Sequence, residues 1–142
     1  MTPLLVLHLV AVGIWLGVIG AEFFIEFDAV KDDESHIKAS KMHFATDIWI
    51  EIPAFLTVGI TGLLMLNASH MEGLFLYKII FGLLAIVFNL VCVVAVYRRR
   101  NFALLGDIAG MKTTNPLMRL GGAGFIPCFL IAIVLAILSV LQ

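Results

Sequence analysis

Four long apolar runs are the feature of this 142-residue chain that most limits what it can fold into. A helix needs about 20 predominantly apolar residues to cross the hydrocarbon core of a bilayer. Lipid offers no hydrogen bonds to a bare backbone, so such segments must be helical. The runs are Leu4–Ala21, Ile48–Leu66, Ile79–Tyr97 and Leu120–Leu141. We therefore predict an all-α integral membrane protein, an antiparallel four-helix bundle that forms one domain over residues 1–142.

The composition agrees with a membrane protein. Hydrophobic residues make up 62% of the chain and charged residues only 13%, and the net charge of −1 gives no reason to expect nucleic acid as a partner. The first run has no basic start and no small-residue cleavage site, so we expect a retained span and not a signal peptide. Cys92 and Cys128 lie in apolar runs, which favours buried thiols over a disulfide.

The basic residues predict the direction of the helices. Of the nine lysines and arginines, all except Lys78 fall between the first and second runs or between the third and fourth. Connections rich in lysine and arginine stay on the cytoplasmic side. We expect both connections to be cytoplasmic, both termini to lie outside, and the protein to reside in the lipid bilayer of a bacterial inner membrane.

Ionisable residues interrupt these runs at a cost of about 2.5–3.5 kcal/mol each near the bilayer centre. They are His8, Glu22, Glu26, His43, Asp47 and Glu51. His8, Trp15 and Glu22 are spaced by seven residues and share one helix face, and Glu26 follows one turn later. His43, Asp47 and Glu51 are spaced by four residues and form one stripe. Both stripes should face the interior of the bundle.

The acids and His43 near the cytoplasmic end are typical metal ligands. Imidazole with carboxylates suits Zn, Fe or Mn better than Cu(I), so we predict an inner metal site from Glu22, Glu26, His43, Asp47 and Glu51. A second interpretation is a partly solvated set of acids that pairs with basic residues: Lys38, Lys41 or the Arg98–Arg100 run. Glu51 lies deeper, and a protonated carboxyl or a proton relay is a third interpretation for it.

His8 belongs to a separate site on the outer side. It lies about 8 Å from the outer end of its run and on the order of 20 Å in depth from His43, so one ion cannot bind both. The expected partners for His8 are His70, Lys78 or a methionine such as Met65 or Met71. A packed histidine is the alternative, but haem ligation is a common use of a histidine in a four-helix bundle.

Several segments together resemble a known superfamily. The first span reads LHLVAVGIWLG, the second IPAFLTVGITGLLML, and the third begins LYKIIFGLL. In order and spacing these are similar to the HemJ-type protoporphyrinogen oxidases and the CopD-like copper-resistance membrane domains. The resemblance covers roughly residues 4–97. It implies haem b bound by His8, with Lys78 as a polar partner. The chain departs from the HemJ pattern around Glu22, Glu26 and His43–Asp47.

Three functions follow from these features. The first is a haem b-binding membrane protein with an electron-transfer or oxidoreductase role, using His8, Trp15 and Lys78, with His70 as the second axial ligand. The second is a divalent-metal transporter or a metal-dependent membrane enzyme that uses the inner acids. The third is a membrane subunit that anchors a partner. A homo-oligomer or a membrane redox partner would be compatible with the first function.

Overall fold

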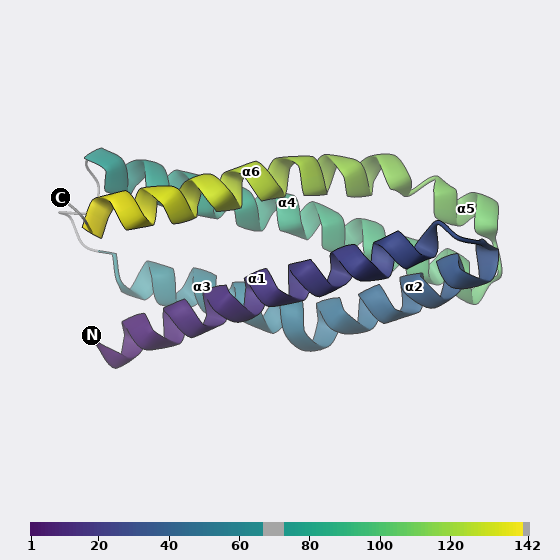
Figure 1. Cartoon of the computed structure of the whole chain (residues 1–142), viewed down its shortest axis with the longest axis horizontal. Helices are drawn as coiled ribbons and strands as arrows, with labels where there is room; N and C mark the ends of the chain where they lie inside the picture. The colour runs from purple at the N-terminus through teal and green to yellow at the C-terminus, as the bar shows by residue number, and fades with distance from the viewer. Residues whose placement is uncertain (67–72, 141–142) are drawn as a thin grey trace.

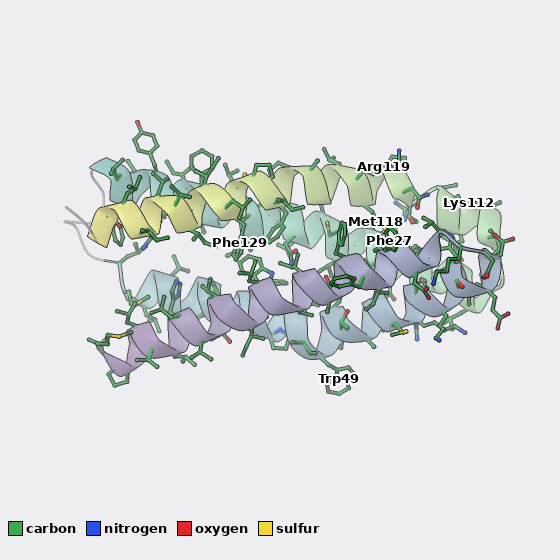
Figure 2. All side chains as sticks on the ribbon, viewed as in Figure 1. Phe27, Trp49, Lys112, Met118, Arg119 and Phe129 are labelled. Atoms are coloured by element: carbon green, nitrogen blue, oxygen red, sulfur yellow. The ribbon has the colours of Figure 1, made fainter. Side chains whose placement is uncertain are left out.

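The computed structural model describes residues 1–66 and 73–140, and every regular element in these ranges is helical. Four helical segments are long and apolar enough to cross a membrane: Pro3–Ala29, Asp33–Leu64, Gly73–Leu104 and Ile108–Ser139. Large apolar side chains cover their outer surface. Trp49 is 80% exposed and Phe24 is 75% exposed, and Trp49 points away from the helices (Figure 2). Such a surface fits contact with lipid and not with water.

The first two helices meet in a short turn. Helix α1 (Pro3–Ala29) begins after Thr2, whose side chain accepts the Leu5 N–H, with Pro3 in the first turn. Helix α2 (Asp33–Thr46) begins after Asp32, whose carboxylate accepts the Ser35 N–H over 2.7 Å. These backbone hydrogen bonds favour the charged carboxylate and lower the pKa of Asp32. Helix α1 continues past Ala21, where its predicted apolar run ends, and α2 lies wholly before the second run, which begins at Ile48.

Helix α2 continues into a π-helical turn, η1 (Asp47–Glu51), and then into α3 (Ile52–Leu64). The cause lies in Pro53. Proline has no N–H for the carbonyl four residues earlier, at Trp49, and its ring crowds that carbonyl. The Ile52 N–H instead bonds to Asp47 O, five residues back. A single wide turn of this kind occurs often at functional sites, and here it carries two of the predicted metal ligands.

The second half of the chain forms another pair of helices. Helix α4 (Gly73–Leu104) ends in a turn at Gly106, whose φ of +68° suits glycine. A short helix, α5 (Ile108–Lys112), leads to α6 (Asn115–Val140). Figure 1 shows that α1 begins and α6 ends at the same end of the molecule, while α5 and the α1–α2 turn lie at the other end. Lys112 and Arg119 lie toward that second end (Figure 2).

Glycines allow α4 and α6 to approach closely. A Cβ at Gly121 would lie only 3.0 Å from both Cys92 N and Phe88 O on α4, and a Cβ at Gly124 would collide with the Phe88 ring. Gly122, in contrast, faces open space. Gly121 and Gly124 therefore lie in the α4–α6 contact, and Gly122 does not. Small residues at helix contacts are a common basis for packing in membranes.

An aromatic layer fills the middle of the molecule. Trp15 is 1% exposed, and its ring centroid lies 5.9 Å from Phe55, 5.3 Å from Phe125 and 4.9 Å from Phe129. Figure 2 shows Phe129 pointing from α6 toward α1. Along α1, Trp15 stands seven residues from His8 on one side and seven from Glu22 on the other. The aromatic layer thus separates the two predicted sites.

Candidate metal centre

Three buried side chains from three consecutive elements meet near one end of the bundle. Glu22 on α1, His43 on α2 and Asp47 on η1 are 7%, 7% and 2% exposed. Each offers a ligand atom that lies within 4.8 Å of the other two. We call these three residues the primary site. The sequence placed them correctly on inward faces, and the fold brings them to one point.

The spacing within the primary site suits a metal ion. His43 Nε2 lies 3.5 Å from Glu22 Oε2 and 3.5 Å from Asp47 Oδ1. This exceeds the usual 2.7–3.2 Å of an N–H···O hydrogen bond. Two ligand atoms that are each about 2.1 Å from an ion at the tetrahedral angle lie about 3.4 Å apart. The observed separations are therefore compatible with ligands around one ion.

Glu26 and Arg99 orient His43. Glu26 Oε1 lies 2.5 Å from His43 Nδ1, and both Glu26 oxygens accept hydrogen bonds from the Arg99 guanidinium, over 2.8 Å in the case of Nη1. Arg99 Nη2 is 3.4 Å from the same Nδ1. With a proton on Nδ1, His43 would present the Nε2 lone pair to Glu22 and Asp47. A carboxylate behind a histidine is the usual support of a metal ligand.

Glu26 therefore differs from its predicted role. We predicted a metal ligand, with pairing to an arginine of the Arg98–Arg100 run as the alternative, and the structure places Glu26 between Arg99 and His43. Arg99 itself is 1% exposed. Three consecutive arginines point in three directions on a helix, about 100° apart, so the sequence could not show which one turns inward.

Further polar groups surround the primary site. The Thr46 hydroxyl lies 2.9 Å from Glu22 Oε1 and 2.8 Å from His43 O, which leaves Glu22 Oε2 facing the histidine. Glu51, 2% exposed, interacts with Asp47 and with Asn89 on α4. Asp47 Oδ1 and Asn89 Nδ2 have no hydrogen-bond partner among the described residues. The same is true of Trp15 Nε1, Ser40 Oγ and Arg99 Nε, and of these five atoms only Asp47 Oδ1 lies within the primary site.

The predicted outer site lies in the other half of the molecule. His8 Nδ1 is 2.9 Å from Thr61 Oγ1, and that hydroxyl is 2.6 Å from Thr57 O. The Thr61 hydroxyl can donate its one proton to the Thr57 carbonyl and accept a hydrogen bond from His8 Nδ1–H. In that arrangement His8 Nε2 carries a lone pair. The His8 ring packs against Gly62, where a Cβ would make an ordinary contact of 3.5 Å with His8 Cε1.

His8 lines a largely apolar cavity of about 820 Å³ that reaches α1, α3, α4 and α6. Lys78 and Met65 line it too, and Lys78 Nζ lies 3.8 Å above the Phe75 ring centroid. Trp15 is part of the aromatic layer and not of the cavity wall. The other expected partners, His70 and Met71, lie outside the described residues.

The chain matches no protein-family model, no curated protein and no solved structure. Its function must therefore be argued from these two sites.

Proposed function

We propose that this protein is an integral membrane metalloprotein that holds a divalent transition-metal ion between Glu22, His43 and Asp47. One observation carries the proposal. The buried Asp47 Oδ1 has no hydrogen-bond partner among the described residues and lies 3.5 Å from His43 Nε2. A carboxylate oxygen in a low-dielectric interior is costly without a cation or a proton donor beside it, and a metal ion bound by both atoms would supply the cation.

The donor set favours Zn, Fe or Mn. It consists of one imidazole and two carboxylates, which these ions prefer. The nearby thiol of Cys92 contacts the Met118 carbonyl, at 3.9 Å, and the face of Gly121 on α6. No sulfur ligand therefore supports Cu(I) at the primary site.

The topology that fits this site is an antiparallel four-helix bundle across a lipid bilayer. The end that carries the α1–α2 turn and α5 also carries eight of the nine basic residues. Cytoplasmic placement of this end follows the usual bias of lysine and arginine. The metal then lies in the cytoplasmic half of a bacterial inner membrane, and both termini lie outside.

The metal is a resident ion and not a transported one. The aromatic layer closes the bundle between the primary site and the outer cavity, and Trp15 and Phe55 are each 1% exposed. A transported ion would need a polar route through this layer. An ion that enters from the cytoplasmic side and remains bound needs no polar route through the aromatic layer.

Metal binding to purified protein tests the proposal. Protein in detergent, stripped with a chelator, is dialysed against Zn²⁺, Mn²⁺ or Fe²⁺ and analysed for bound metal. The wild type should retain ion, and Asp47→Asn, which keeps the size but removes the charge, should bind at least tenfold more weakly. Asp33→Asn is the matched control, because the Asp33 side chain is 70% exposed. Equal binding by Asp47→Asn and wild type would rule out the site.

A second function is supported by the outer cavity. Its volume of about 820 Å³ falls within the 300–1,000 Å³ of ordinary cofactor sites. His8 Nε2 offers a lone pair for axial ligation, and Lys78 offers a cation for a propionate. Haem b at His8, as the resemblance to the HemJ and CopD-like proteins implies, would add an electron-transfer or oxidoreductase role and a membrane redox partner. A Soret band in wild type that His8→Ala abolishes supports this function, and no Soret band after haem-supplemented expression discards it.

A further inference from the structure

An arginine that no acid of the described residues neutralises lies where α2 packs against α4. The Arg100 guanidinium stands 4.7 Å above the centroid of the Phe44 ring, which is a cation–π contact. No acid among the described residues forms an ion pair with Arg100. Arg99, one position earlier, is buried and pairs with Glu26. The two neighbouring arginines therefore have different partners, and the ring holds the Arg100 guanidinium in place without cancelling its charge.

The neighbours of Arg100 form a small surface that extends over both helices. Phe44 also contacts the Tyr97 ring, with 6.1 Å between centroids, and Tyr97 is 54% exposed. Tyr97 precedes Arg100 by three residues on α4, and Lys41 precedes Phe44 by three residues on α2, so each pair shares one helix face. Lys41 is exposed and forms no ion pair with a described acid. We call Lys41, Phe44, Tyr97 and Arg100 the α2–α4 seam.

Both helices present the same order of side chains along the bundle. Helix α2 begins at the end that carries the α1–α2 turn, and α4 ends there, next to α5 (Figure 1). From that end inward, each helix places first a cation, then an aromatic ring, and then exposed apolar side chains at helical spacing. These apolar residues are Ile48 after Phe44, and Val94 and Leu90 before Tyr97, which are 41%, 53% and 46% exposed. The order matches the headgroup, the interface and the acyl region of a phospholipid.

We propose that the α2–α4 seam binds one anionic phospholipid of the cytoplasmic leaflet. Arg100 and Lys41 hold its phosphate, and an acyl chain lies along Val94 and Leu90. A guanidinium offers parallel N–H groups that match two phosphate oxygens, and the Phe44 ring fixes the plane of this fork. A soluble phosphate would gain nothing from the apolar side chains deeper in the bilayer, so a lipid fits the seam better. The inference uses the proposed topology but not the metal centre, so either can fail without the other.

Native mass spectrometry of the full-length protein in detergent, titrated with phosphatidylglycerol, tests the seam. The wild type should bind a first lipid about fivefold or more tightly than any further lipid. Phosphatidylcholine with the same acyl chains should show no such step. Arg100→Gln should abolish the tight first step. Arg98→Gln is the matched control, because Arg98 is exposed, pairs with no described acid and undergoes the same change of charge. It should retain the tight step.

Three other results would overturn the proposal. Equal weakening by Arg98→Gln and Arg100→Gln would show attraction spread over the whole cytoplasmic end and not a site. Equal binding of phosphatidylcholine would show that the charge has no role. Displacement of the lipid by glycerol phosphate would show that the seam takes a soluble phosphate.

Two more variants test the geometry of the seam. Phe44→Leu keeps both cations but removes the ring, so it should weaken the first step, and unchanged binding would contradict the role of the ring. Arg100→Lys keeps the charge and loses the fork, so its affinity should lie between those of the wild type and Arg100→Gln. It also decides the test if circular dichroism shows that Arg100→Gln has lost helix, and wild-type affinity in Arg100→Lys would contradict paired recognition of the phosphate. Metal content should be the same in all these variants, which separates this inference from the proposed function.

Discussion

The contact between Glu26 and His43 makes metal affinity depend on a residue that does not touch the metal. Glu26 Oε1 lies 2.5 Å from His43 Nδ1, and the Arg99 guanidinium, on a residue that is 1% exposed, donates hydrogen bonds to both Glu26 oxygens. Glu26→Gln keeps the size of the side chain. It removes the charge that keeps the proton on Nδ1, and it turns an N–H₂ group toward either the guanidinium or the ring. We predict that the Nε2 lone pair of His43 is then available to a metal ion in only a fraction of the molecules.

The size of the effect follows from this arrangement. Changes in residues that support metal-bound histidines typically weaken metal affinity 10- to 100-fold, which corresponds to about 1.4–2.7 kcal/mol. The substitution also leaves Arg99 buried without an anion. Breaking a fully buried pair costs about 3–5 kcal/mol of stability. The Glu26 side chain is 31% exposed, so solvent screening should place the loss below that range.

Competition with a chromophoric Zn²⁺ chelator measures the affinity, and ¹⁵N spectra of labelled histidine report the Nδ1 and Nε2 proton populations. Asp28→Asn is the matched control, because Asp28 lies on the same helix, pairs only with Lys31 and is 47% exposed. Its affinity should be unchanged. A folded Glu26→Gln variant that binds Zn²⁺ as tightly as the wild type, with an unchanged proton position, would refute the reasoning.

Three further predictions test other parts of the account. Gly121→Ala should destabilise the protein by about 1–3 kcal/mol, because a Cβ there meets the α4 backbone. Gly122→Ala faces open space and should be neutral or stabilising by up to about 1 kcal/mol; equal effects in detergent unfolding would contradict the α4–α6 contact. Thr61→Val removes the acceptor of the His8 Nδ1–H and should lower haem retention, as read from the Soret band, while Thr61→Ser retains it. The pKa of Asp32 is held below its usual 3.8 by the Ser35 N–H, so its capping contribution is complete above that pH and is lost as the pH falls through the lowered pKa. The protection factors of the amides at the start of α2, which are corrected for the intrinsic exchange rate, should therefore fall in acid in the wild type and not in Asp32→Asn, and identical acid profiles would contradict the cap.

The sequence predicted the spans and the inward stripes because both depend on simple periodicity. Lipid excludes charge, so an apolar helix must turn a stripe of ionisable residues toward the interior of the bundle. His43, Asp47 and Glu51 form such a stripe. The same argument correctly separated His8 from the acids, since depth follows directly from residue number at 1.5 Å per residue.

The contacts that give the site its chemistry could not be predicted in this way. Glu26 could have faced solvent, a metal or any of three arginines, and only the relative rotation of α1 and α4 selects Arg99. A helix can accommodate a proline such as Pro53 either by a kink or by a π-helical turn. The sequence therefore did not predict the π-helical turn at Asp47–Glu51. The contact of His8 with Thr61 likewise depends on how α1 and α3 are rotated against each other, which the sequence does not give.

X-ray absorption at the metal edge of the Zn²⁺-loaded protein tests the central claim most directly. The account predicts nitrogen and oxygen ligands at about 2.0–2.2 Å, with imidazole scattering that disappears in His43→Gln. A spectrum that the substitution leaves unchanged, or sulfur ligands at about 2.3 Å, would show that the metal binds elsewhere in the protein.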